Sequence, residues 1–152
     1  MSALVKRLRE ELALQLATNF TTTIVAATST LLSFNIQPSE VWAVDIQLTA
    51  QCSGTGGSKY AIAAPAGATI EGWIYSSTSS ILTPSYQRMT AINTLNATAL
   101  HTVATTPGPD IVRALVTNAA TAGAVALQAA SVTATQTTTL FASSYLCARR
   151  IA

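Results

Sequence analysis

Charged side chains are scarce in this sequence. Only 9% of its 152 residues are Asp, Glu, Lys or Arg, whereas an ordinary soluble domain has about 25%. The net charge is +2, and basic residues cluster only in the mixed-sign stretch KRLREE at residues 6–11, which excludes the electrostatic footprint of a nucleic-acid-binding protein. A surface with so little charge gains little from self-repulsion, so we expect partners or copies of the same chain to cover it.

Groups that perform acid–base chemistry are also few. The one histidine, His101, has no acid within eight residues in the sequence, although a general base needs a partner within hydrogen-bond reach. The acids that follow the N-terminal segment fall at turns or at polar strand positions, where a solvated or capping role is expected; they are Glu40, Asp45, Glu71 and Asp110. No G-x-S-x-G motif occurs. We therefore expect no catalytic residues, and the chain is not predicted to be an enzyme.

Cysteine is limited to Cys52 and Cys147. One histidine and two cysteines 95 residues apart match no zinc-ligand spacing, and the acids do not cluster as a calcium site requires. No metal or cofactor is therefore expected. The two thiols allow one disulfide, but buried free thiols are the simpler interpretation, and both alternatives stay open.

Long apolar runs are absent too. No stretch of about 18 apolar residues exists that would predict a transmembrane helix. Glu10 and Glu11 interrupt the N-terminal region where a signal peptide would be apolar. The sequence therefore predicts neither a membrane span nor a secretion signal.

The N-terminal segment has a helical pattern. Lys6 and Glu10 form a pair with i,i+4 spacing, as do Arg7 and Glu11, and four apolar residues are spaced to share one helix face: Val5, Leu8, Leu12 and Leu16. This pattern predicts a short amphipathic helix from about residue 2 to 17, within an arm of residues 1–20. The apolar face packs either on its own domain or on a neighbouring subunit. We expect the second arrangement, with these four residues as the partner-binding face.

The rest of the chain, residues 21–152, alternates with a period of two. Trp42, Val44, Ile46 and Leu48 fall on one face of a predicted strand, with polar residues between them. Further strands are predicted around Tyr60, Val112 and Val125, and in Thr-rich stretches at 21–26, 29–36, 69–76, 86–93, 99–104, 137–142 and 144–150. Gly and Pro turns separate these segments. Eight to ten short strands without βαβ alternation predict an all-β fold, an antiparallel β-sandwich or jelly roll.

Aromatic residues offer one candidate contact surface, a glycan-stacking set drawn from Trp42, Trp73, Tyr75, Tyr86 and Tyr145. Trp42 alternates with core positions and is expected to be buried. Trp73 and Tyr75 lie two residues apart in a predicted strand, so they share a face and are the better candidates for an exposed patch, such as one that stacks on glycans.

Three stretches, taken in order, resemble a β-rich module of virion structural proteins from tailed bacteriophages. They are LSFNIQPSEVWAVDIQLTAQ (32–51), SKYAIAAPAGATIEGW (58–73) and IVRALVTNAATAGAVALQAASVTATQTTTLFASSYLCARRI (111–151). The shared features are an L-x-F strand followed by a turn and a Glu-x-Trp strand, a Pro-x-Gly turn, and a Ser-x-Leu-x-x-x-Arg ending. Residues 76–105 and the predicted helix lie outside the resemblance.

The resemblance implies a non-enzymatic subunit of a phage particle. Modules of this kind are found as capsid decoration (cement) proteins, head fibres and tail proteins, often as trimers. The first hypothesis is therefore a homotrimeric decoration protein on the phage head surface, bound to the major capsid protein. The alternative is a receptor- or glycan-binding module of a head fibre or tail, with Trp73 and Tyr75 in its contact patch.

Overall fold

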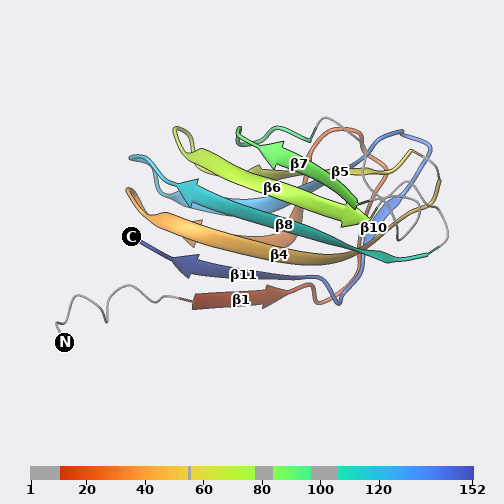
Figure 1. The fold of residues 1–152 in the computed structure, drawn as a ribbon, viewed down its shortest axis with the longest axis horizontal. Coiled ribbons are helices and arrows are strands. Elements are labelled where there is room, and N and C mark those ends of the chain that lie inside the picture. The colour runs from red at the N-terminus through yellow and green to blue at the C-terminus, as the bar shows by residue number, and fades with distance from the viewer. Residues whose placement is uncertain (1–10, 55, 78–83, 97–105) are drawn as a thin grey trace.

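The computed structural model describes residues 11–54, 56–77, 84–96 and 106–152. Within these ranges the chain forms strands and no helix (Figure 1), and thus no helix that is long and apolar enough to cross a membrane. The strands are β1 (Glu11–Gln15), β2 (Phe20–Thr22), β3 (Thr28–Ile36), β4 (Val41–Cys52), β5 (Ser58–Ala63), β6 (Thr69–Ser77), β7 (Pro84–Met89), β8 (Gly108–Thr117), β9 (Gly123–Ser131), β10 (Thr138–Leu140) and β11 (Tyr145–Arg150).

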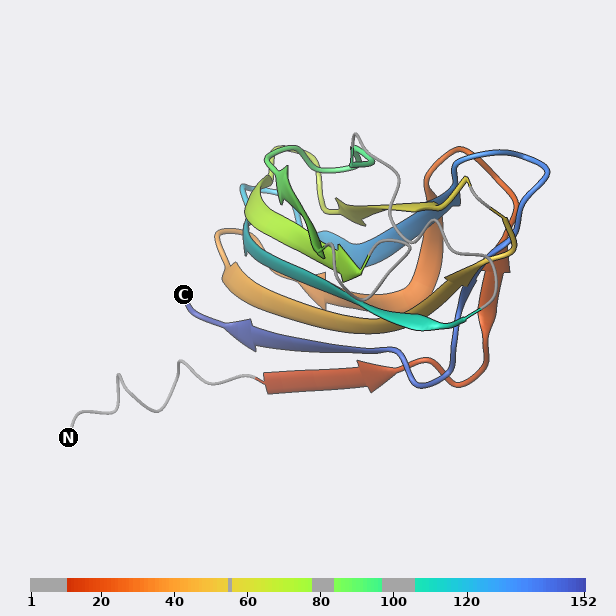
Figure 2. The same ribbon diagram turned by 45° about the vertical axis from the view of Figure 1, so that its right-hand side comes forward.

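The strands form two antiparallel sheets. The larger has eight strands in the order β1-β11-β4-β8-β6-β7, with β10 between β4 and β2. Since β10 and β11 pair with successive parts of β4, strands β1 and β2 lie along one edge of this sheet and β7 forms the other. The smaller sheet has the order β3-β9-β5 and lies behind the larger one (Figures 1 and 2). The expectation of an all-β antiparallel fold is confirmed, whereas the jelly-roll connectivity stays a prediction.

The core lies between the two sheets and follows the period-two pattern of the sequence. On β4, Trp42, Val44, Ile46 and Leu48 are all buried, as predicted. The smaller sheet contributes residues such as Phe34, whose ring centroid lies 5.1 Å from that of Trp42. Apolar residues of both sheets belong to one continuous cluster, so burial of the two inner faces holds the sheets together.

The predicted N-terminal helix is wrong for its described part. Residues 11–15 form β1, which pairs with β11 from Glu11↔Arg149 to Gln15↔Tyr145. The physical reason is a second periodicity in the same residues, because Leu12, Leu14 and Leu16 also alternate with a period of two. Pairing with β11 turns this face toward the core, and tertiary pairing outweighs helix propensity. Residues 1–10 of the predicted arm lie outside the described residues.

Two turns between strands contain a residue with a positive φ. Gly67 has a φ of 83°, and the Ala68 amide donates to the Pro65 carbonyl at 3.1 Å, so Pro65-Ala66-Gly67 closes the turn between β5 and β6. Ser39 has a φ of 62° in the turn between β3 and β4. The strand predicted at 99–104 lies outside the described residues.

Candidate functional site on the outer face of the large sheet

The outer face of the eight-stranded sheet carries most of the described charged side chains. Strand alternation places every second residue on this face, and the register aligns them in rows across the sheet. One row runs from β7 to β1 through Arg88, Trp73, Arg113, Asp45, Cys147 and Ala13. Residues far apart in the sequence are thus neighbours on one surface.

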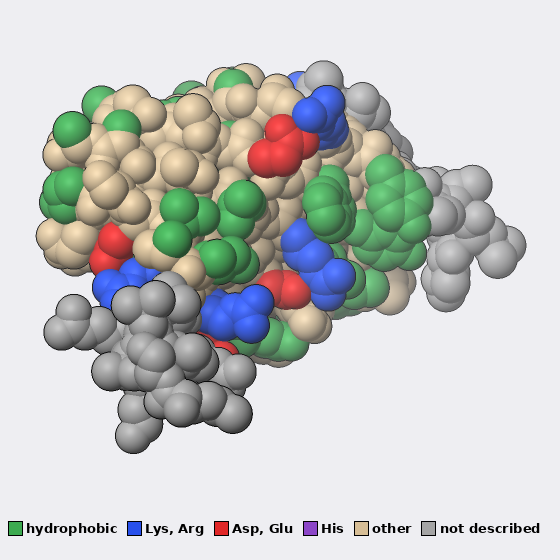
Figure 3. Space-filling model, turned by 60° about the vertical axis from the view of Figure 1, so that its left-hand side comes forward, with side chains coloured by type: hydrophobic (Ala, Val, Ile, Leu, Met, Phe, Trp, Pro, Cys, Tyr) green, Lys and Arg blue, Asp and Glu red, His purple; other side chains and the backbone are tan. Residues whose placement is uncertain are grey.

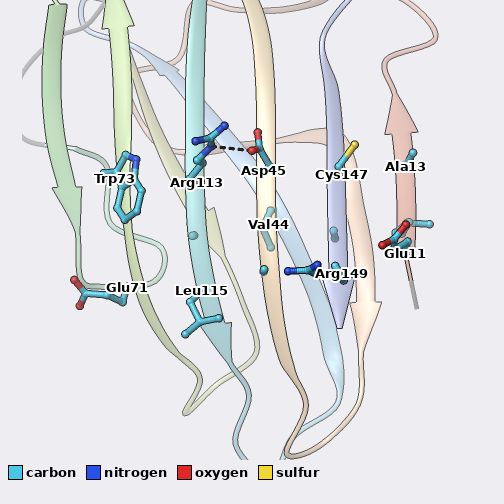
Figure 4. Close-up of a pocket in the computed structure, with 14 residues that line it drawn as sticks. Glu11, Ala13, Val44, Asp45, Glu71, Trp73, Arg113, Leu115, Cys147 and Arg149 are labelled. Atoms are coloured by element: carbon cyan, nitrogen blue, oxygen red, sulfur yellow. Dashed lines mark hydrogen bonds and ion pairs between the residues drawn. The ribbon is translucent and has the colours of Figure 1, made fainter. Parts of the chain in front are cut away.

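Two ion pairs lie in this part of the face. The Arg113 Nε donates to Asp45 Oδ2 at 2.8 Å, as Figure 4 shows. The Arg88 Nη2 lies 2.7 Å from Glu71 Oε1. The four side chains are between 38% and 71% exposed, so each pair adds little to stability. Their effect on the surface is to fix two guanidinium groups and cancel their charge.

A hollow of about 670 Å³ opens beside this row. Its floor includes Ala43 on β4, which lies between Leu115 on β8 and Arg149 on β11. The short alanine side chain between longer neighbours leaves the depression. Trp73 lines the hollow toward β6, and Glu11 lines it toward β1 (Figure 4).

The aromatic residues of β6 and β7 gather at the other edge of the face. Trp73 is 52% exposed and Tyr86 is 70% exposed. The rings of Tyr75 and Tyr86 have centroids 5.0 Å apart at an interplanar angle of 58°. Trp73 and Tyr75 thus share the outer face of β6, as the sequence analysis expected. The sequence alone does not place Tyr86 next to Tyr75, because the contact between these two rings depends on the register of β6 and β7.

The structure describes two of the four predicted residues of the arm, Leu12 and Leu16. Leu16 is 2% exposed in the core, and Leu12 packs against the same core. In the single chain these two residues therefore contact their own domain. Val5 and Leu8 lie outside the described residues. Residues 11–16 are hydrogen-bonded into the large sheet. The division of the chain into an arm and a domain at residue 20 stays a prediction.

A second polar cluster is buried between the sheets. The Tyr60 hydroxyl donates to Asp110 Oδ2 at 2.6 Å, and the Ser76 hydroxyl donates to Oδ1 of the same carboxylate. All three residues have no exposed surface. Burial, followed by the neighbouring Asp110 carboxylate, raises the pKa of Tyr60 well above its usual range. The full burial of the three side chains gives the cluster the geometry of a structural link between the two sheets.

The remaining candidates from the sequence are the two cysteines and His101. Cys52 is buried and Cys147 is exposed, and both thiols are free. His101 lies outside the described residues. No group of three His, Cys, Asp or Glu side chains that could hold a metal ion occurs in the described ranges.

Comparisons with known proteins identify no family. No family model matches the chain, and no curated protein matches it. Among solved structures, the VP2 subviral particle of infectious bursal disease virus matches 95% of this chain and 37% of that chain at 13% identity, with a TM-score of 0.24. The Gt strain of the same virus matches 94% and 37% at 12% identity, with a TM-score of 0.26. The chain thus spans little more than a third of those chains, and likeness at these scores does not bear on function.

Proposed function

We propose that this chain is a non-enzymatic virion structural protein of a tailed bacteriophage, and specifically a capsid decoration protein. It forms a homotrimer of jelly-roll-like domains on the head surface and stabilises the shell by binding the major capsid protein. The ordered sequence resemblance over residues 32–51, 58–73 and 111–151 supports the class. The low content of charge supports a subunit whose surface is covered in an assembly.

The observation that carries the proposal is the edge position of β1. Within the described residues β1 pairs only with β11, so its other side is open to a strand or segment of another chain. The ten residues before Glu11 include Val5 and Leu8. Ten extended residues span at most about 33–36 Å, a length that suits contact with a neighbouring subunit. The proposed attachment surface is therefore the open edge of β1 together with residues 1–10.

The location is tested by cryo-electron microscopy of the phage particles encoded by the same genome. Many copies at threefold or quasi-threefold positions, with residues 1–10 crossing a subunit boundary, are the expected result. A few copies at a vertex or on the tail would replace decoration by a fibre or tail role. Absence of the chain from the particle would overturn both assignments.

The attachment surface is tested with a deletion that spares β1. Removing residues 1–10 should abolish or weaken rebinding to particles stripped of this protein and should leave the unfolding transition unchanged. Substitution of Leu31, which is 70% exposed on the smaller sheet, by Ala is the matched control and should rebind normally. Full rebinding of the deletion variant would remove residues 1–10 from the proposal.

A further inference from the structure

We propose that the β6–β7 corner of the large sheet binds neutral saccharides. The site, here called the aromatic platform, consists of Trp73, Tyr75 and Tyr86 with the flanking Arg88 and Arg113. This binding activity goes beyond the proposed attachment to a capsid and does not depend on it.

Two aromatic residues of the platform, Trp73 and Tyr86, are exposed, Tyr75 is partly buried, and sheet register holds all three in place. Trp73 lies between Arg88 on β7 and Arg113 on β8, and Tyr75 lies opposite Tyr86. Exposed fractions of 52% for Trp73 and 70% for Tyr86 leave large ring surfaces in water. Figure 3 shows exposed hydrophobic side chains on this side of the molecule next to acidic and basic ones. Flat rings that bury an apolar face and have polar tips suit ligands with one apolar and one polar side.

The charged groups beside the rings are already oriented. Glu71 Oε1 accepts from both Arg88 Nε at 2.8 Å and Arg88 Nη2 at 2.7 Å, and Asp45 holds the Nε of Arg113. An arginine has five N–H donors, so both guanidinium groups keep donors for a ligand. The carboxylates add acceptors. Such donor and acceptor pairs next to a stacking surface match the hydroxyl groups and the C–H face of a pyranose ring.

The charge balance selects the class of saccharide. The two arginines of the platform and their partners Glu71 and Asp45 together carry no net charge, and each cation is within 2.8 Å of its anion. An acidic sugar would have to compete with Glu71 and Asp45 for the guanidinium groups, whereas a neutral sugar can bind without breaking either pair. A neutral pyranose is therefore the ligand that fits.

Tyr86 and Arg88 of the platform lie on β7, at the opposite edge of the sheet from β1, while Trp73 lies on β6 and Arg113 on β8. Five strand intervals separate β1 from β7 in the order β1-β11-β4-β8-β6-β7, which is about 24 Å at a spacing of ~4.8 Å. A domain attached through the edge of β1 would therefore keep the β7 side of the platform, with Tyr86, accessible. The same subunit can then bind the shell at one edge and a glycan at the other.

The test is binding of the full chain to an array of neutral and acidic glycans, followed by titration calorimetry with the strongest neutral binder. We expect dissociation constants below the millimolar range, and a loss of about tenfold or more in the Trp73→Ala and Tyr86→Ala variants because stacking partners are removed. Leu31→Ala is the matched control, since Leu31 is 70% exposed on the smaller sheet and lies outside both the platform and the hollow. It should bind as the unsubstituted chain does.

Several results would overturn the proposal. These are no binding to any neutral glycan, binding to acidic glycans alone, or equal affinity in Trp73→Ala and the unsubstituted chain. Native mass spectrometry of the same variants tests a protein interface at this position. A change of oligomeric mass in Trp73→Ala but not in Leu31→Ala would assign the platform to contact between copies and reject the saccharide site.

Discussion

The Tyr60 hydroxyl on β5 donates a hydrogen bond to the Asp110 carboxylate on β8 at 2.6 Å, and this bond crosses from the smaller sheet to the larger one. The Ser76 hydroxyl on β6 binds the other oxygen of Asp110. The three groups are fully buried, where a carboxylate without donors would be costly. The two hydroxyl donors therefore make an acid compatible with the interior of an otherwise apolar sandwich.

Replacing Tyr60 with Phe should destabilise the domain by about 2 kcal/mol, because a buried acceptor on Asp110 loses a donor. Urea unfolding followed by fluorescence measures this loss. Tyr86→Phe is the matched control, because Tyr86 is 70% exposed, and it should change the free energy of unfolding by less than about 0.5 kcal/mol. Equal stability of both variants would show that the link between Tyr60 and Asp110 contributes nothing.

The same pair predicts how stability responds to high pH. The pKa of Tyr60 is raised by burial and by Asp110, while an unfolded tyrosine has a pKa of about 10. Above that pH the unfolded chain loses a proton that the folded chain keeps, so the free energy of unfolding falls, by at most about 1.4 kcal/mol per pH unit. Tyr60→Phe lacks this term. The stability difference between the unsubstituted chain and Tyr60→Phe should therefore shrink by about 1 kcal/mol from pH 10 to 11, as measured by urea unfolding. A constant difference would contradict the raised pKa.

The sequence predicts those parts of the fold that depend on a local pattern. The buried face of β4 was predictable because alternation is continuous from Trp42 to Leu48. The conformation of residues 11–15 was not, because their leucines fit two periodicities and the choice depends on pairing with β11, more than 120 residues away in the sequence. Asp110 was expected at a solvated position, but its hydroxyl donors come from distant strands.

The candidate site likewise has residues that the sequence predicts and residues that it does not. It was predictable that Trp73 and Tyr75 lie on one face of a strand, because residues two apart point to the same face in any β-strand. Their neighbours Tyr86, Arg88 and Arg113 depend on strand order and register, which a single sequence does not specify. The hollow over Ala43 is likewise a product of register, since the longer side chains around it come from other strands.

Leu16 distinguishes the observed strand from the predicted helical arm. The side chain is 2% exposed and belongs to the core, so Leu16→Ala should destabilise the domain by about 2–4 kcal/mol through lost burial and a cavity. Leu31→Ala removes the same atoms from a side chain that is 70% exposed and should cost less than about 0.5 kcal/mol. Thermal or urea unfolding measures both. If Leu16→Ala is as stable as Leu31→Ala, Leu16 does not pack in the core, and the prediction of a separate N-terminal arm would stand.

Glu40 should make stability depend on acidic pH. Burial acts to raise the pKa of this carboxyl, but hydrogen bonds from the Gln37 amide, the Trp42 indole and the Arg150 guanidinium outweigh it, and the pKa is lowered. The three donors lie 2.8–2.9 Å from the carboxylate oxygens. An amide cannot accept at both of these positions, so Glu40→Gln should lose about 1–2 kcal/mol at pH 7.

This loss should disappear at low pH. A lowered folded-state pKa gives stability that is complete above the unfolded pKa of about 4.3 and is lost as the pH falls through the folded value. The difference between the unsubstituted chain and Glu40→Gln should therefore be constant from pH 7 to 5 and shrink below about pH 4, as measured by urea unfolding across this range. Glu71→Gln is the matched control, because Glu71 is 58% exposed in its pair with Arg88, and it should cost less than about 1 kcal/mol at pH 7. If Glu40→Gln costs no more than Glu71→Gln, the contacts that join the β3–β4 turn to the end of β11 do not stabilise the fold.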